Sequence, residues 1–194
     1  LAEEYGGRLL VVPLDVASDE SVRAAADVLG RNTDHVDFLI NNAAILGDIE
    51  RRIDQEPDFD EMQRVINVNA VGPLRVTASV VELLRNADEP TVLNISSESG
   101  SVSNCWRRAW FGYCMSKAAL NRGMRIVAND LEPQGIRVLC LHPGHLRTWM
   151  RGHLDESAST TPDEAAARIL ALVLDEGVDP ERFFVDSNGE PMPW

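Results

Sequence analysis

Tyr113-Cys114-Met115-Ser116-Lys117 is the stretch of the sequence that is most informative about fold and function. Lys117 is the single lysine among 18 basic residues, and the other 17 are arginines. Residues four apart share one face of a helix, so the lysine ammonium can lie near the Tyr113 phenol. A nearby cation lowers the pKa of a phenol from about 10, which suits proton transfer at neutral pH. The alternative is an ordinary surface helix, and the motif alone does not exclude it.

The length and composition predict one soluble domain over residues 1–194, with a sizeable core. The net charge of −13 argues against nucleic acid or an anionic membrane as a partner. No apolar run approaches the roughly 20 residues of a membrane span, and no signal peptide opens the chain. Three cysteines without a C-x-x-C pair predict reduced thiols and a cytoplasmic location.

Short apolar runs alternate with amphipathic segments along the chain. The runs predict strands at 9–16, 36–40, 91–95, 136–141 and 182–185. The amphipathic segments predict helices at 18–29, 60–85, 113–131 and 161–174, with a polar loop over 46–58. Gly72-Pro73 is expected to break or kink the second helix. Strands that alternate with helices of this length predict an α/β fold with a doubly wound, parallel, Rossmann-like sheet.

Polar or glycine-rich segments follow several of the predicted strands. They are Asp15, 41–44, 96–100 and 142–144. Ligands of open α/β sheets bind beyond the carboxyl ends of the strands, where these segments fall. Any one of them can be ordinary turn chemistry. Together with a Tyr-x-x-x-Lys motif between two strands, they predict a ligand site at this edge of the sheet.

Six motifs, taken together, are typical of one enzyme family. They are Leu14-Asp15-Val16, Asn41-Asn42-Ala43-Ala44, Asn67-Val68-Asn69, Asn94-Ile95-Ser96-Ser97, Tyr113-x-x-x-Lys117 and Pro143-Gly144-x-x-x-Thr148. With them the chain resembles the short-chain dehydrogenase/reductase family over essentially its whole length. The ending, 183–194, is similar to the C-factor-like carbonyl reductase branch.

The resemblance implies an NAD(P)-dependent oxidoreductase that interconverts a carbonyl and an alcohol by hydride transfer. Tyr113 would then exchange a proton with the substrate oxygen, and Lys117 would lower the Tyr113 pKa and bind the nicotinamide ribose. Ser97 would hold the substrate oxygen and stabilise charge that grows in the transition state. Asn69 would fix a water that links Lys117 to solvent; the alternative is a helix-interior asparagine that satisfies its own backbone.

The resemblance also implies positions for NAD(H) or NADP(H). Asp15 and Val16 would meet the adenine, and Asn42, Ala43 and Ala44 would pass beneath its ribose. Residues that would border the nicotinamide are Pro143, Gly144 and Thr148. The family's habit also implies a homodimer or homotetramer, built on the helices at 60–85 and 113–131. No metal site is expected, because His142 and His145 lack a third ligand at a convincing spacing.

The sequence departs from the family pattern in three ways. Ala44 stands where glycine is usual. An insertion-like segment, 104–111, carries aromatic residues that suit either a bulky, apolar substrate or packing on the sheet or a partner. No T-G-x-x-x-G-x-G phosphate loop occurs, so the first strand–helix units, roughly 40–50 residues, are expected to be absent before Leu1.

The missing loop leaves other interpretations open. The chain can be a fragment of a longer reductase, or it can repair its sheet by a new pairing. It can also be a non-catalytic or signalling relative that lacks competent dinucleotide binding. The retained residues Asn69, Ser97, Tyr113 and Lys117 favour an enzyme.

Overall fold

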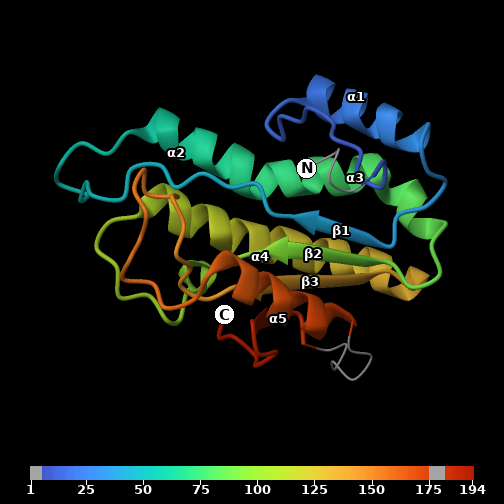
Figure 1. Ribbon diagram of the computed structural model, residues 1–194. Coiled ribbons are helices and arrows are strands. Elements are labelled where there is room, and N and C mark those ends of the chain that lie inside the picture. The colour runs from blue at the N-terminus through green and yellow to red at the C-terminus, as the bar shows by residue number, and fades with distance from the viewer. Residues whose placement is uncertain (1–5, 175–181) are drawn as a thin grey trace.

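A parallel sheet of four strands forms the centre of the fold in the computed structural model, which describes residues 6–174 and 182–194 (Figure 1). Its strands lie in the order β1, β2, β3, β4, and each pairs in parallel with the next. Their bounds are Phe38–Asn41, Thr91–Ile95, Arg137–His142 and Phe184–Asp186. The predicted parallel α/β fold is therefore confirmed, with crossover helices between successive strands.

Helices cover both faces of this sheet (Figure 1). Their bounds are α1 Asp19–Gly30, α2 Phe59–Ile66, α3 Gly72–Arg85, α4 Phe111–Leu131 and α5 Pro162–Leu174. Val92, Val138 and Cys140 lie in the core that includes residues of α3 and α4. The strand residues between them, Leu93 and Leu139, pack instead with residues of α5. This alternation, in strands that are apolar throughout, is what a sheet buried on both faces requires.

Two helix starts follow the predicted capping chemistry. The Ser18 side chain accepts a hydrogen bond from the Ser21 backbone N–H at the start of α1. At the start of α5, Thr161 and Glu164 form a reciprocal capping box: each side chain accepts a hydrogen bond from the other residue's backbone N–H. These bonds satisfy N–H groups that have no partner inside the helix.

The predicted helix over 60–85 is interrupted by a π-helix, Asn67–Val71, that joins α2 to α3. Pro73 has no N–H, so it cannot donate to the carbonyl of Asn69, four residues earlier. The N–H of Gly72 bonds instead to the carbonyl of Asn67, five residues back, as in a π-helix. The sequence correctly located this irregularity but did not predict its type.

The predicted strand over 9–16 is wrong. No residue of this stretch is in a strand, and Leu10 and Val11 are 51% and 70% exposed. Within the part of the chain that the structure describes, β1 pairs only with β2. In this part, no further strand lies beyond the other edge of β1 with which residues 9–16 could pair. A strand forms only with a hydrogen-bonded neighbour, whatever its apolar content. The new pairing considered above does not occur in the described residues.

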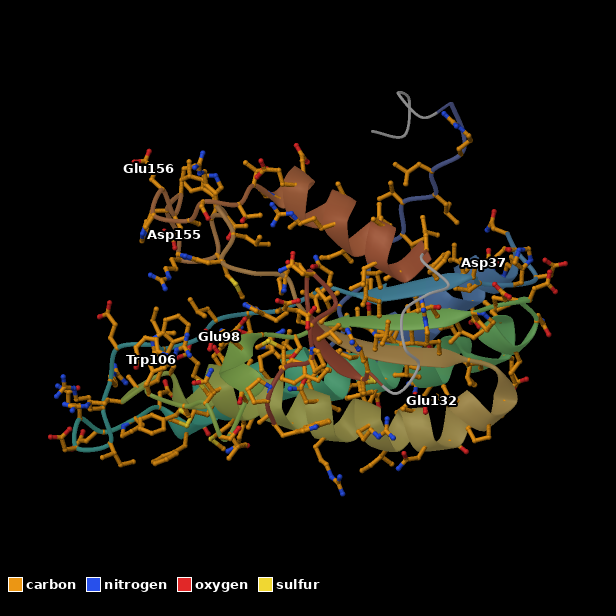
Figure 2. The ribbon with its side chains drawn as sticks, turned by 90° about the horizontal axis from the view of Figure 1, so that it is seen from below. Asp37, Glu98, Trp106, Glu132, Asp155 and Glu156 are labelled. Carbon is orange, nitrogen blue, oxygen red and sulfur yellow. The ribbon has the colours of Figure 1, made fainter. Side chains whose placement is uncertain are left out.

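The carboxyl ends of the strands meet at one end of the molecule (Figure 2). Glu98, which follows β2, lies there with Trp106, Asp155 and Glu156, whereas Asp37, just before β1, lies at the opposite end. Of the described helices, none has the length and apolar character needed to cross a bilayer. This end of the sheet carries the predicted site.

Candidate active site

The side chains of Tyr113 and Lys117 are buried together on α4. They are one helical turn apart, and their residues are 8% and 2% exposed. The Lys117 Nζ lies 5.6 Å from the centroid of the Tyr113 ring. The surface-helix alternative is therefore excluded: both residues lie on the face of α4 that packs on the sheet.

Lys117 does not act on the Tyr113 pKa in the expected way. Its ammonium donates to the carbonyl oxygen of Ile95 at 2.7 Å, and burial lowers the Lys117 pKa to about 8. Burial raises the pKa of Tyr113 above its ordinary value, and a hydrogen bond with Ser97 opposes that rise. Desolvation of the phenol outweighs any benefit from the lysine in this state, so Tyr113 stays protonated at neutral pH.

Ser97 lies directly after β2 and caps a short 3₁₀ helix, Glu98–Gly100. Its Oγ accepts a hydrogen bond from the backbone N–H of Ser99 at 3.1 Å. The hydroxyl group keeps its own hydrogen as a donor, and its interaction with the Tyr113 phenol favours the phenolate. The structure thus brings a hydroxyl and a phenol together at the carboxyl end of β2.

Asn69 lies in the π-helix and is 1% exposed. Its Oδ1 accepts from the backbone N–H of Ile45 at 2.8 Å. Its Nδ2 donates to the carbonyl of Ile45 at 2.8 Å and to Ser116 Oγ at 3.0 Å. Ser116 Oγ in turn donates to the carbonyl of Tyr113 at 2.7 Å. Both amide hydrogens are used in these bonds, so the Asn69 side chain has no donor left for a water, and its backbone carbonyl is an available acceptor.

The predicted adenine contacts lie beside the π-helix. The carbonyl oxygen of Val16 accepts from Arg75 Nη1 at 2.6 Å, and the Val16 side chain is the nearest neighbour of Gly72. Asp15 is exposed, and its Oδ1 accepts from the backbone N–H of Ala17 at 2.9 Å. Asp15 and Val16 therefore keep a defined place near α3 although they form no strand.

The other predicted cofactor contacts follow β1 and β3. Asn42 and Ala43 are exposed, and Ala44 is half-buried, directly before Ile45, which Asn69 holds. Gly144 has a φ of +91° with open space where a side chain would begin. The remaining members of this set, Pro143 and Thr148, are half-buried. No glycine-rich loop of the described residues lies beside these cofactor contacts. The doublet Gly6-Gly7 stands in open space, with no atom within 4 Å of where a Cβ would be.

Two asparagines, the half-buried Asn41 and the buried Asn94, link the ends of neighbouring strands, a role that the sequence did not reveal. Asn41 Nδ2 donates to Asn94 Oδ1 at 2.9 Å, linking β1 to β2. Asn94 Nδ2 donates to the carbonyl of Leu139 at 3.0 Å, linking β2 to β3. An asparagine near the carboxyl end of an otherwise apolar strand could have indicated this role, because a buried amide needs hydrogen-bond partners.

An ion pair and two tryptophans of the segment 104–111 lie beside Ser97, and the ion pair was not predicted from the sequence. Arg107 donates to both carboxylate oxygens of Glu98, at 3.0 and 2.5 Å, and this pairing lowers the Glu98 pKa. The guanidinium also stands 4.9 Å from the ring centroid of Trp106 and 4.7 Å from that of Trp110. Trp110 meets Tyr113 edge to face at 5.9 Å. The segment 104–111 is thus fixed against the phenol and against residues 96–103, which follow β2 and are called the serine loop below.

The two histidines considered as metal ligands have separate surroundings. His145 lies within hydrogen-bond distance of Asp155, at 2.9 Å. A hydrogen bond from the Ser157 hydroxyl, together with this contact, lowers the Asp155 pKa to about 2. Burial lowers the His142 pKa, and its Nδ1 has no hydrogen-bond partner among the described residues. Glu98 is close enough to oppose that shift, so His142 borders the serine loop.

Comparison with known proteins places the chain in a family. The profile of the family described as "short chain dehydrogenase" matches residues 1–159. C-signal of Myxococcus xanthus is 37% identical over 171 residues, which covers 84% of this chain and 95% of that protein. The 1-hydroxy-2-glutathionyl-2-methyl-3-butene dehydrogenase of Rhodococcus sp. (strain AD45) is 30% identical over 186 residues, which covers 93% of this chain and 78% of that protein.

Solved structures agree with the sequence relatives. NADPH-bound carbonyl reductase from chicken fatty liver superposes with a TM-score of 0.87 at 28% identity, covering 99% of this chain and 80% of that chain. Carbonyl reductase Sniffer of D. melanogaster gives a TM-score of 0.87 at 25% identity, covering 100% and 81%. The sheet, the strand-end site and these relatives agree: this chain belongs to the short-chain dehydrogenase family, a family of oxidoreductases.

Proposed function

We propose that this chain is an NAD(P)-dependent oxidoreductase that interconverts a carbonyl and an alcohol, with Ser97, Tyr113 and Lys117 as its catalytic residues. The observation that carries the proposal is the pairing of the Ser97 hydroxyl with the Tyr113 phenol, above a buried lysine, at the carboxyl end of β2. Carbonyl reduction needs a proton donor and a second hydrogen-bond donor at one oxygen, and this pair provides both.

Tyr113 serves as the proton donor in the reductive direction. Its raised pKa keeps the phenol protonated at neutral pH, so the proton is available when charge develops on the substrate oxygen. Ser97 donates its hydroxyl hydrogen to the same oxygen and stabilises that charge. The nicotinamide cofactor, when bound, supplies or accepts the hydride.

Lys117 holds the cofactor's ribose. An ammonium has three hydrogens, and one of them is used on the carbonyl of Ile95. Two donors remain for ribose hydroxyls or a water. With a pKa of about 8, the group is mainly protonated at pH 7, although it is buried. The carbonyl of Asn69, which Pro73 leaves without its α-helical donor, holds the water that connects this lysine to solvent.

The residues around the nicotinamide end fit a dinucleotide in their chemistry. Gly144 leaves open backbone after β3, and Pro143 and Thr148 flank it. Asn42, Ala43 and Ala44 are accessible after β1 for the ribose. Asp15 and Val16 are held beside α3 for the adenine. The diphosphate has no glycine-rich cradle in the described residues, so its binding is the weakest part of the fit.

The segment 104–111 lines the substrate mouth and selects a bulky, apolar carbonyl compound. Trp110 contacts the edge of the Tyr113 ring, which places an aromatic wall next to the reacting phenol. Trp106 is 75% exposed and extends this surface toward solvent. The carbonyl reductases that superpose on the chain support a carbonyl substrate.

The chain acts as one domain over residues 1–194, as a cytoplasmic homodimer or homotetramer. All three cysteines are free, which agrees with a reducing compartment. Apolar side chains exposed on α4, Met115 and Ile126, provide the surface for a second subunit.

A second function, as a signalling or non-catalytic relative, is favoured by one observation. The protein at 37% identity is a C-signal, and the alignment covers 95% of it, compared with 78% of the Rhodococcus dehydrogenase. A relative of that protein can retain the fold without binding a dinucleotide.

Titration calorimetry with NADPH and with NADH, on the 194-residue chain, separates these two functions. Binding of either cofactor that is weakened in a Lys117→Ala variant is expected for the enzyme. A chain that unfolds cooperatively but binds neither cofactor would contradict the enzyme proposal for this chain and favour the non-catalytic alternative. Nicotinamide fluorescence provides an independent measure of the same binding.

A further inference from the structure

A cavity lies between the serine loop and α4. Its volume is ≈ 430 Å³, and Val102, Ser103, Asn121, Arg122, Arg125 and Trp194 are among the residues that line it. Neither Ser97 nor Tyr113 lines it, so it is separate from the proposed reaction site. This volume is within the range of small-molecule sites.

Asn121 is among the residues that line this pocket, but its amide nitrogen lies beneath the surface. The residue is 1% exposed, and its Oδ1 accepts from Ser96 Oγ at 2.6 Å. Its Nδ2 is buried and has no hydrogen-bond partner among residues 6–174 and 182–194. A ligand in the pocket does not reach this nitrogen, so the charged donors that it meets come from the arginines of the lining.

Two arginines give the pocket a positive charge, although the whole chain carries a net charge of −13. Arg122 and Arg125 both line it, and no acidic side chain in the described part of the chain does. No described carboxylate lies within ion-pair distance of either guanidinium. In the 194-residue chain these two guanidinium groups outnumber the one α-carboxylate of Trp194, and a lining of this charge attracts an anion.

The remaining lining is apolar and aromatic. Trp194 stacks on Phe183 with ring centroids 5.7 Å apart, and Arg125 stands 5.4 Å from the same Phe183 ring. Both the backbone N–H and the hydroxyl of Ser103 donate to the carbonyl oxygen of Trp194, which fixes this residue at the edge of the pocket. Val102 forms an exposed apolar rim.

We propose that this pocket binds a small organic carboxylate with an aromatic or aliphatic body. The carboxylate oxygens accept hydrogen bonds from the guanidinium groups of Arg122 and Arg125, and the body lies against Val102 and Trp194. A carboxylate matches this site because its two acceptor oxygens suit the planar guanidinium group, which presents several N–H donors.

Calorimetry with two isosteric probes tests the proposal on the 194-residue chain. The probes are 2-naphthoate and its uncharged analogue 2-naphthamide. Naphthoate is expected to bind at least about tenfold more tightly than naphthamide, because only the carboxylate makes charge-assisted hydrogen bonds. Equal affinity of the two probes would overturn the proposal.

Variants then locate the bound probe. Arg122 is exposed, so Arg122→Gln is expected to fold normally and to weaken naphthoate about tenfold without changing naphthamide. Arg23→Gln, at an exposed arginine of α1, is the matched control for net charge and is expected to bind like the wild type. Val102→Trp, at a 77% exposed position, is expected to fill the pocket and to exclude both probes. Equal weakening in the two arginine variants would overturn the assignment.

The alternative occupant is a second copy of the chain. Sedimentation of the wild type and of Val102→Trp distinguishes it from a ligand. If the wild type is a dimer that binds no naphthoate, and Val102→Trp is a monomer, the pocket is an interface between copies and the proposal fails. Unchanged sedimentation, together with carboxylate-selective binding, supports it.

Discussion

The ammonium of Lys117 donates a hydrogen bond to the carbonyl oxygen of Ile95 at 2.7 Å and thereby ties the middle of α4 to the end of β2. The contact directs the ammonium to a backbone carbonyl, while burial keeps the pKa of the Tyr113 phenol above its ordinary value. It also makes Lys117 a buried charge, with consequences for stability.

The stability of the fold is expected to depend on pH through Lys117. Its pKa falls from 10.5 to about 8 on folding, so between these values the unfolded chain binds a proton that the folded chain does not. Consequently the contribution of Lys117 to the free energy of unfolding rises with pH across this window. Lys117→Met removes this contribution, so the stability of the variant relative to wild type should fall by roughly 3 kcal/mol between pH 7 and pH 10.5.

Urea unfolding of both proteins at several pH values measures this difference. Titration of Tyr113 occurs in both proteins and largely cancels in the comparison. A difference that does not change from pH 7 to pH 10 would show that the lysine titrates normally in the folded chain.

Tyr113→Phe should abolish turnover and spare cofactor binding. The variant keeps the ring that packs against Trp110 and loses only the hydroxyl that donates the proton. Loss of a positioned proton donor lowers kcat by about 10²–10⁴-fold. Stopped-flow oxidation of NADPH with a carbonyl substrate measures turnover, and calorimetry on the same variant measures cofactor affinity. Turnover near the wild-type rate would mean that another group donates the proton.

Glu98 and Arg107 should be energetically coupled more strongly than an exposed pair. They form two hydrogen bonds, and their side chains are 30% and 11% exposed. A double-mutant cycle with Glu98→Gln and Arg107→Gln is expected to give a coupling free energy of about 1–2 kcal/mol. Glu82 and Arg85, exposed on α3, provide the control cycle, with an expected coupling of about 0.5 kcal/mol or less. Equal coupling in the two cycles would show that the serine loop is not anchored by this pair.

Two glycine-to-alanine substitutions should change stability in opposite directions. A Cβ at position 100 would stand 2.7 Å from Asn121 Nδ2 and 2.9 Å from the carbonyl oxygen of Lys117, so Gly100→Ala should cost about 2 kcal/mol or more. A Cβ at Gly30, in the last turn of α1, meets nothing within 4 Å. Gly30→Ala should stabilise by up to about 1 kcal/mol. Thermal or urea unfolding measures both, and a neutral Gly100→Ala would contradict the close packing of the serine loop on α4.

Local patterns in the sequence predicted most of the fold because they report directly on burial. The periodicity of 113–131 and the apolar run at 91–95 match α4 and β2 closely. The segment 9–16 is as apolar as a buried strand, but pairing needs a partner that its own residues cannot reveal. A π-helix likewise depends on which carbonyls remain free, although Pro73 indicated where the helix would change.

The sequence predicted which residues form the candidate site better than it predicted the contacts that those residues make. Spacing and resemblance pointed to Ser97, Tyr113 and Lys117, which the fold brings to one strand end. The partner of Lys117 is a backbone carbonyl, which no side-chain pattern encodes. The Glu98–Arg107 pair joins two loops whose approach depends on tertiary packing, so the charges alone did not predict it.

The π-helix between α2 and α3 also fixes how many residues this part of the chain can contain. A π turn amounts to one residue inserted into an α-helix, and each residue of an α-helix turns it by about 100°. Deleting a single residue within Asn67–Val71 would therefore rotate the face of α2 that carries Met62 and Val65 away from Gly112 on α4. A one-residue gap at this place, in an alignment with a relative, would thus mean a difference in the rotation of α2 as well as in length. The polar loop at 46–58, by contrast, can gain or lose a residue without turning any helix.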